Sequence, residues 1–324
     1  MGLHYILDSF DGLDSDWRAI QSKVTYSSIF SSPEWSRTWW EHFGNGSRLY
    51  LGSVKTDSRT IGIAPLVIRE NAACFIGSID LCDYLDFIIE PGEEENFFKA
   101  LLDNLTGEGI TTLDLAPLKP DSPSSAILVN TAKNLGWETS ITQEDVSLVL
   151  DLPNSWEDYL KLLSGKQRHE LMRKMRRLNE AGEINFRSTD RNTAAEMEIF
   201  LRLFRESRED KAEFLTPQRE KFINSIAAAM STVNSLRLNI LEINTSPIAA
   251  TICFDYQNDV YLYNSGYDPE YGWLSVGVIS KALCIKDSIQ RSKKRFDFLK
   301  GDEKYKYHLG GNEISLSRCI LKHN

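Results

Sequence analysis

Apolar residues along the chain follow two periods, one typical of strands and one typical of helices. Short or alternating apolar runs predict strands at residues 3–7, 49–54, 61–68, 74–76, 86–89, 112–115, 146–150, 183–187, 236–243, 247–255, 260–265, 296–299 and 314–321. Apolar positions spaced by three or four residues predict helices at residues 14–21, 33–43, 93–105, 125–135, 156–178, 194–208, 217–230 and 276–291. The two kinds of element alternate, which predicts an α/β (α+β) fold.

The helix at 33–43 has clear predicted ends. Ser32 is a typical N-cap, Pro33 fits the first helical position and Gly44 is a typical stop. The aromatic residues of this helix are Trp35, Trp39, Trp40 and Phe43. Aromatic side chains at helical spacing usually lie in a core, so we expect burial, and a sugar-stacking role is the alternative.

The length of 324 residues is enough for two domains. Pro153 follows a predicted strand, so we place the boundary near it and expect domains at 1–150 and 151–324. Residues 47–64 resemble residues 235–250, since each segment has a strand, a tight turn and a second strand that ends in small residues. A repeat of this period indicates duplicated domains.

Composition narrows the class of protein. With 42% hydrophobic and 26% charged residues, the chain has enough apolar material for a core and does not have the composition of a disordered chain. The net charge of −9 argues against unspecific nucleic-acid binding. The N-terminus lacks a signal-peptide pattern and no apolar run has the length of a membrane span, so we expect a cytoplasmic protein.

Metal and disulfide chemistry are not expected. The five cysteines form no CxxC pair, and the five histidines form no HxxxH or HExxH spacing. We therefore predict reduced, buried thiols and no metal site.

The segment most indicative of chemistry spans residues 260–291, where a strand, a glycine-containing loop and a long helix follow one another. The N–H groups at a helix start carry partial positive charge, so the start at Val276 predicts an anion site that fits a pyrophosphate. Gly277 would let such a ligand approach the backbone closely. The alternative is that Gly272 and Gly277 only shape the loop. The segment has neither the Walker A pattern nor the GxGxxG pattern.

The predicted strand at 296–299 ends abruptly in charged residues. Charged residues at the C-terminal end of a central strand commonly face a ligand crevice. The charged residues that follow this strand are Lys300, Asp302, Glu303, Lys304 and Lys306. A solvated run of charges is the alternative.

Two more segments are candidates for binding. Asp83 and Asp86 flank Tyr84 in an apolar stretch, where they either line a groove or mark a loop. Residues 161–177 hold one acidic residue, Glu170, among the basic residues Lys161, Lys166, Arg168, Arg173, Lys174, Arg176 and Arg177. This helix either presents an electropositive lip to phosphate groups or is a solvated face.

Several of these segments together resemble one known family. The segment SGYDPEYGWLSVG, the helix after it and FDFLKGDEKYKY are similar to the C-terminal signature of the BioF2-like (CelD/BcsL) acetyltransferases of the GNAT superfamily, which are relatives of the FemAB aminoacyltransferases. The segments FSSPEWSRTWWEHFG, IGIAPLVI, DYLDFII and SGKQRHELMRKMRRL also resemble that family, in its order. Val276 departs from the family pattern, which more often has proline before this glycine.

The resemblance implies two GNAT (acyl-CoA N-acyltransferase) folds in tandem, with mixed, mostly antiparallel sheets flanked by helices. A donor, acetyl-CoA or another acyl-CoA, would bind the second module at Ser275, Val276, Gly277, Lys300 and Lys306. An amine or sugar acceptor would enter the groove between the modules, near Asp83, Tyr84 and Asp86. Arg168 and Arg173 would contact phosphate groups of CoA, of an acyl-carrier protein or of tRNA.

Transfer of an acyl group from a thioester to an amine needs a base for the proton of the nucleophile and an acid for the leaving thiolate. The candidate bases are Asp86 and Glu303, and the candidate acids are Tyr263, Tyr305 and Tyr307. No Ser-His-Asp or Cys-His arrangement stands out, which favours direct transfer over an acyl-enzyme.

The expected function is therefore acyl transfer from an acyl-CoA to an amine or hydroxyl, in envelope or polysaccharide biosynthesis if the family link holds. The second interpretation is a FemAB-like enzyme that uses aminoacyl-tRNA, although the long helical hairpin of tRNA-dependent relatives is not evident in the sequence. The third is a GNAT-like binding protein without activity.

Overall fold

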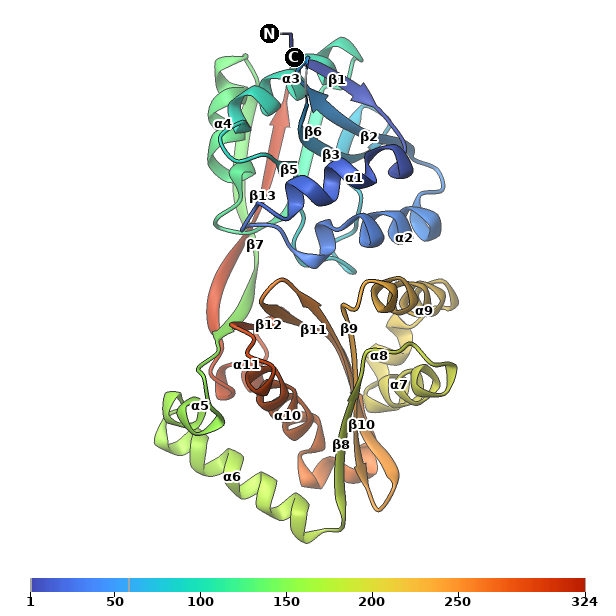
Figure 1. Ribbon diagram of the computed structural model, residues 1–324, viewed down its shortest axis with the longest axis vertical. Coiled ribbons are helices and arrows are strands. Elements are labelled where there is room, and N and C mark those ends of the chain that lie inside the picture. The colour runs from blue at the N-terminus through green and yellow to red at the C-terminus, as the bar shows by residue number, and fades with distance from the viewer. Residues whose placement is uncertain (1, 58, 324) are drawn as a thin grey trace. The chain divides into compact units, whose positions relative to one another are not determined.

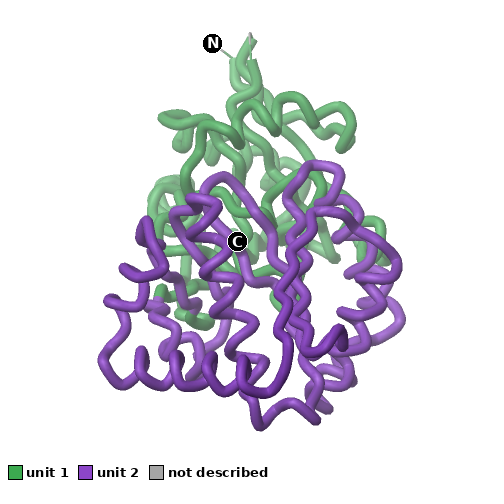
Figure 2. Tube along the Cα trace, turned by 60° about the horizontal axis from the view of Figure 1, so that its bottom comes forward, with its two compact units in different colours: residues 1–146, 314–324 green, residues 147–313 purple. Residues whose placement is uncertain are grey.

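The computed structural model describes residues 2–57 and 59–323, and the chain divides into two compact units. Unit 1 comprises residues 1–146 and 314–324, and unit 2 comprises residues 147–313 (Figure 2). The chain thus returns to unit 1 at its end, whereas the division expected from the sequence, 1–150 and 151–324, is sequential. The returning strand is β13 (Asn312–Lys322), which pairs antiparallel with β6 (Thr112–Leu118).

Unit 1 contains a mixed sheet with the strand order β1-β2-β3-β4-β6-β13-β7. Its other strands are β1 (His4–Leu7), β2 (Arg48–Lys55), β3 (Thr60–Arg69), β4 (Ala72–Phe75) and the first part of β7 (Glu138–Asp151). Strands β1 to β4 pair antiparallel in turn, whereas β4 and β6 run parallel. A short strand, β5 (Ile88–Ile89), pairs with β3 outside this order.

The helices of unit 1 are α1 (Phe10–Gln21), α2 (Pro33–Phe43), α3 (Glu94–Gly107) and α4 (Pro123–Asn134) (Figure 1). The predicted ends of α2 are confirmed, because the hydroxyl of Ser32 accepts from the N–H of Trp35 at 3.2 Å and Gly44 follows the last helical residue. Trp35 and Trp39 are fully buried, as expected for core residues, so these two rings are not available to stack on a sugar.

Unit 2 contains a sheet with the strand order β7-β12-β11-β10-β9-β8. Its strands, besides the end of β7, are β8 (Ile184–Thr189), β9 (Leu236–Ile243), β10 (Ser246–Tyr256), β11 (Asp259–Tyr267) and β12 (Arg295–Lys300). The predicted meander is confirmed, because β9, β10 and β11 pair antiparallel in turn. The long helix α10 (Val276–Gln290) connects β11 to β12, which run parallel. Mixed sheets with flanking helices confirm the expected fold class.

Helices cover both faces of the sheet of unit 2 (Figure 1). One face carries α7 (Ala194–Ser207), α8 (Glu209–Phe214) and α9 (Pro217–Thr232), and the other carries α10 and α6 (Gly165–Glu180). Gly266 on β11 lets α7 pack closely, since a Cβ there would lie 2.2 Å from the backbone nitrogen of Phe204. On the other face, Ala282 and Ile285 of α10 share a core cluster with Phe296 of β12.

The structure differs from the predicted elements at residues 156–178 and after β12, among other places. Residues 156–178, expected as one helix, form α5 (Trp156–Leu162) and α6. Ser164 causes the break, because its side chain and that of Gln167 form a capping box that starts a new helix. The charged residues after β12 contain a short helix, α11 (Lys304–His308), which the hydrophilic sequence does not indicate.

Candidate functional site

The parallel strands β11 and β12 pair over only part of their length. Pairing ends at Tyr261↔Asp297, yet β11 continues to Tyr267 and β12 continues to Lys300. β12 also shifts its register against β7 between Asp297 and Lys300, and Leu299 in this bulge has a φ of +64°. We call the unpaired stretches, residues 262–267 and 298–300, the β11–β12 split. Ligands of α/β proteins commonly bind where neighbouring parallel strands end.

Helix α10 begins at the end of this split. The carbonyl of Ser275 accepts from the N–H groups of Val278 and Ile279, at 3.0 and 3.1 Å. Within the described part of the chain, the N–H groups of Val276 and Gly277 have no backbone acceptor. Ser275, Val276 and Gly277 thus form a helix start of the kind that binds anions in proteins.

Gly277 also makes room for a neighbouring side chain. A Cβ at this position would lie 3.0 Å from Cδ1 of Tyr267, whereas a Cβ at Gly272 would have no atom closer than 3.9 Å. A side chain at position 277 would therefore press against the ring at the end of β11, which would have to shift by a few tenths of an ångström. This packing reason for Gly277 comes in addition to the ligand approach that the sequence suggests.

Lys306 is buried beside the split, and its ammonium bonds to protein groups. The residue is 2% exposed, and Nζ donates to the carbonyls of Leu299 at 2.8 Å, Lys300 at 2.6 Å and Gly301 at 3.0 Å. The same Nζ lies 2.8 Å from a carboxylate oxygen of Glu303. These contacts give Lys306 the role of shaping the loop after β12, and they do not support the donor contact expected for it. Lys300 contributes its carbonyl to this arrangement.

Glu303 is half exposed, and its carboxylate pairs with Lys306. Burial by itself favours the neutral acid, but the hydrogen bond and the charge of Lys306 outweigh burial and hold the pKa of Glu303 below its usual value. A carboxylate with a lowered pKa is a weaker base. Glu303 is therefore less suited to accept a proton than its position in the sequence suggests.

The three tyrosines named as candidate acids lie in different surroundings. Tyr263 is on the part of β11 that lies in the split. Tyr305 on α11 is half-buried, its ring centroid lies 6.4 Å from that of Phe298 on β12, and burial raises its pKa. The hydroxyl of Tyr307 donates to Glu313, and this bond raises the pKa of Tyr307 to about 12. Tyr263 and Tyr305 thus border the split, whereas the hydroxyl of Tyr307 is engaged by another partner.

The basic helix α6 packs beside the start of α10. Leu178 of α6 and Val276 of α10 belong to one core cluster. Arg177 donates to the carbonyl of Trp273, and its guanidinium lies 5.1 Å from the centroid of that exposed indole. The positive charge of α6 therefore lies next to the amides of the helix start.

The two arginines expected to contact substrate differ in their partners. Arg173 forms two hydrogen bonds with Glu170, at 2.9 and 2.8 Å. Arg168 is exposed, and among the described residues it forms no salt bridge. The guanidinium of Arg168 is thus the freer of the two to pair with a phosphate. Arg173, in contrast, lies closer along α6 to Leu178, which shares a core cluster with Val276.

Asp86 lines a narrow recess in unit 1. The residue is 6% exposed, and its carboxylate accepts from the hydroxyl of Ser124 at 2.7 Å and from the N–H of Phe87 at 2.9 Å. Burial raises the pKa of Asp86 to about 6, although hydrogen bonds from Ser122 and Ser124 oppose the rise. A buried carboxyl that titrates near neutral pH has the property expected of a proton-transfer group.

Tyr84 and Asp86 line the same recess, whereas Asp83 is not among its lining residues. The ring of Tyr84 is buried, Nζ of Lys119 lies 5.6 Å from its centroid, and its carbonyl accepts from Ser28. The recess is lined by Tyr26, Ser28, Ser31, Tyr84, Leu85, Asp86 and Lys119. The recess leaves no room for a water-sized molecule, so its polar groups are packed against one another in this conformation.

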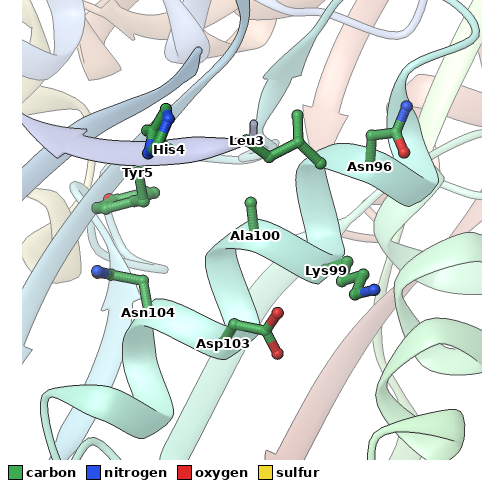
Figure 3. Close-up of a pocket in the computed structure, with 8 residues that line it drawn as sticks. All are labelled: Leu3, His4, Tyr5, Asn96, Lys99, Ala100, Asp103 and Asn104. Atoms are coloured by element: carbon green, nitrogen blue, oxygen red, sulfur yellow. The ribbon is translucent and has the colours of Figure 1, made fainter. Parts of the chain in front are cut away.

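A wider cavity of unit 1 lies between β1 and α3 (Figure 3). It encloses about 590 Å³ and is lined by Leu3, His4, Tyr5, Asn96, Lys99, Ala100, Asp103 and Asn104. None of the candidate residues named from the sequence lies in its wall, so we assign it no part in the chemistry.

Sequence reasoning missed two lysines near the split. Lys211 on α8 donates from Nζ to the carbonyl of Ser265, and Lys281 on α10 is only 7% exposed. The sequence does carry a signal for Lys281, because this lysine interrupts the apolar stripe of α10. That stripe comprises Val278, Ala282, Ile285 and Ile289.

No helix among the described residues has the length and apolar character needed to cross a bilayer. The same residues hold no group of three or more His, Cys, Asp or Glu side chains arranged to bind a metal ion.

Comparison with known proteins identifies the fold. Residues 165–307, which include the split, α10 and most of α11, match the family model described as an acetyltransferase (GNAT) domain. No curated protein matches the chain.

Three solved structures are similar over almost the whole chain. FemX has a TM-score of 0.67 at 10% identity, with 98% of this chain and 96% of that chain covered. The C-terminal domain of a putative lysylphosphatidylglycerol synthetase from Agrobacterium fabrum has a TM-score of 0.60 at 8% identity, with 96% of this chain and 92% of that chain covered. A tandem GNAT protein from the clavulanic acid biosynthesis pathway has a TM-score of 0.53 at 10% identity, with 100% of this chain and 99% of that chain covered. At these identities the likeness shows the shared fold alone.

Proposed function

We propose that the chain is an acyltransferase that moves an acyl group from an acyl-CoA thioester to an amine or hydroxyl acceptor, because residues 165–307 match the model of a GNAT acetyltransferase domain. Unit 2 would bind the donor. The acceptor, an amine or an amino sugar, would meet unit 1 near Asp86 and Tyr84, where the recess would have to open because it leaves no room for a water-sized molecule.

The β11–β12 split, followed directly by the start of α10, is the observation that carries this proposal. An extended chain with amide groups, such as the pantetheine arm of CoA, can pair with the edge of β11 that β12 leaves unpaired beyond Tyr261. The pyrophosphate at the end of that arm suits the N–H groups of Val276 and Gly277. One continuous feature thus fits both the apolar and the anionic parts of the donor.

The residues keep separate roles in this proposal. Ser275, Val276 and Gly277 receive phosphate through the backbone, and Arg168 adds positive charge from α6. Lys306 and Glu303 hold the loop after β12 in place. Tyr263 and Tyr305 border the reacting thioester.

An aminoacyl donor carried by tRNA is the second candidate function. The observation that favours it is the basic face of α6 beside the helix start, because a polyanion would engage several arginines at once. Within the first candidate function, acyl transfer from acyl-CoA, the sequence resemblance supports a more specific proposal. This is a BioF2-like role in envelope or polysaccharide biosynthesis.

A thermal-shift titration with acetyl-CoA, longer acyl-CoAs and free CoA tests the donor. A ligand that binds only the folded state stabilises it by about 2.7 kcal/mol at 100 times its Kd, so the unfolding temperature should rise with concentration. Release of free thiol, measured with a panel of amino acids and amino sugars, then identifies the acceptor. If no CoA compound changes the unfolding temperature, the acyl-CoA proposal is wrong and charged tRNA is the donor to test next.

A further inference from the structure

Lys281 lies on the buried face of α10, where an ionised side chain is costly. The residue is 7% exposed and directly precedes Ala282, a residue of the core cluster, in the chain. Removing an ammonium from water costs several kcal/mol unless a counter-ion compensates. A lysine in this place therefore needs a physical reason.

The contacts of the Lys281 amine are few. Nζ donates to the carbonyl of Gly277 at 2.7 Å, one turn earlier in α10, and lies 4.8 Å from the ring centroid of Tyr305. Among the described residues no carboxylate forms a salt bridge with it, since Glu303 is engaged by Lys306. The amine thus has one hydrogen-bond acceptor, although an ammonium can donate three hydrogen bonds.

These contacts place the amine next to the β11–β12 split. Tyr305, which lies under the amine, contacts Phe298 on the unpaired end of β12. Gly277, which accepts its hydrogen bond, belongs to the helix start that ends the split. Lys281 therefore adjoins the region in which the proposed donor would lie.

The groups that act on Lys281 come from each element around it. Burial, together with the positive charge of Lys211 on α8, lowers the pKa of Lys281 to about 7. Cys284 of α10, Glu303 and Cys253 of β10 oppose this shift. The amine is therefore neutral in a large fraction of molecules near pH 7, and a neutral amine has a lone pair that can accept a proton.

We propose that Lys281 is the proton-transfer group of the acyl transfer, an inference that rests on the proposed function. As the acceptor nitrogen bonds to the thioester carbon, the neutral amine of Lys281 takes a proton from that nitrogen. The carbon–sulfur bond then breaks, and the ammonium of Lys281 gives the proton to the leaving thiolate. The products are an amide and a free thiol, and Lys281 returns to its neutral form without any other reactant.

The other candidates in unit 2 are less suited to this role. The carboxylate of Glu303 and the ammonium of Lys306 are paired with each other. Tyr305 has a raised pKa, which makes its phenol a weak donor to a thiolate. Burial also lowers the pKa of Lys211, to about 8, but its Nζ donates to the carbonyl of Ser265, so Lys281 is the lysine near the split with the lower proton affinity.

The test compares Lys281→Met and Lys281→Arg with Lys286→Met as the matched control. Lys286 is on the same helix and also lies over an aromatic ring, 5.9 Å from the centroid of Trp156. Rates are measured from pH 5.5 to 9 with the acyl-CoA and the amine selected above, and again with an amine of different pKa. If a limb of the pH profile is caused by a group of the enzyme, its midpoint pH stays the same when the acceptor amine is changed. If it is caused by the acceptor, the midpoint moves with the pKa of the amine.

We expect Lys281→Met and Lys281→Arg each to lower kcat at pH 7.5 by about 100-fold or more, and to lose the limb near pH 7. Arginine keeps the positive charge but does not deprotonate, so it separates proton transfer from charge. The thermal shift caused by the donor should remain in both variants, and Lys286→Met should behave like the wild type.

A Lys281→Arg variant with wild-type rate and pH profile would overturn the inference, and it decides the question even if Lys281→Met does not fold. A Lys281→Met variant within a factor of ten of the wild type would overturn it as well. The absence of turnover by the wild-type protein with every acyl-CoA counts against the proposed function itself, which is a different result.

Discussion

At the scale of single residues, the charged side chains of the candidate sites in the two units divide into structural and titrating groups. Lys306 has four oxygen partners and Glu303 pairs with Lys306, so both side chains hold the loop after β12 in place. Asp86 is buried with uncharged hydrogen-bond partners, and Lys281 is buried with one. Burial is therefore the largest influence on both groups and moves their pKa values toward neutrality. The second kind is the one that can exchange protons near pH 7.

Lys306→Met should destabilise unit 2 more than Glu303→Gln does. The first change leaves the carbonyls of Leu299, Lys300 and Gly301 without their donor, at about 1–3 kcal/mol for each buried group that water does not reach. The second change leaves the ammonium of Lys306 with those three carbonyls. Urea unfolding measures both variants, and equal losses would show that the ion pair, not the carbonyl contacts, holds the loop.

Asp86→Asn should change how stability depends on pH. The pKa of Asp86 in the folded chain is raised from 3.8 to about 6, so the folded state holds the proton more tightly and the wild type loses stability as pH rises through this window. Above about pH 6 the loss is complete. Asparagine has no such charge, so the variant should gain stability relative to the wild type at pH 7.5 but not at pH 4.

Urea unfolding at the two pH values measures this difference. Asp103→Asn on the exposed face of α3 is the control for the loss of one negative charge. An Asp86→Asn variant whose stability relative to the wild type is the same at both pH values would show that Asp86 titrates like an exposed carboxyl.

At the scale of elements, α6 and α10 together form the candidate phosphate site. The helix start of α10 supplies amides, and α6 supplies arginines beside them. The sequence indicates both parts, because a loop with glycines before a long helix and a concentration of basic residues are visible without a structure. The break between α5 and α6 is less visible, since it depends on the capping box of Ser164 and Gln167.

Arg168→Glu should weaken CoA binding more than Arg173→Glu does. Arg168 has no salt-bridge partner among the described residues, whereas the charge of Arg173 is already balanced by Glu170. Arg168 is exposed, so solvent and salt screen its interaction with a phosphate. We therefore expect the charge reversal to lower the affinity for CoA by about threefold to tenfold at low salt and by less at high salt. Calorimetric titration with CoA at two salt concentrations measures the loss, and equal affinities for both variants would make α6 a solvated face.

At the scale of the whole molecule, the chain path is not sequential. Strand β13 enters unit 1 after unit 2 is complete and pairs with β6 from Ser317↔Leu118 to Lys322↔Thr112. The proposed donor residues lie within 147–313, and the Asp86 recess lies within unit 1. The two proposed binding functions thus belong to different compact units.

Removal of residues 314–324 should therefore damage unit 1 and spare unit 2. The shortened chain loses the strand that lies between β6 and β7 in the sheet order of unit 1. We expect faster proteolysis within residues 1–146 and an unchanged Kd for CoA, both measured against the full chain. A shortened protein that no longer binds CoA would show that the donor site depends on the returning strand.

The sequence alone determines the local parts of this protein. Apolar periodicity predicts most strands and helices, Ser32 and Gly44 predict the ends of α2, and the segment from β11 to α10 predicts the anion site. These features depend on neighbours within a few residues, so the local pattern contains the information.

Only the tertiary structure decides what buried charges do. The partners of Lys306 and the surroundings of Lys281 and Asp86 come from segments that pack together, and burial and the charges at close range set their pKa values. The return of β13 to unit 1 is of the same kind, because strand pairing joins residues about 200 positions apart that no local pattern links.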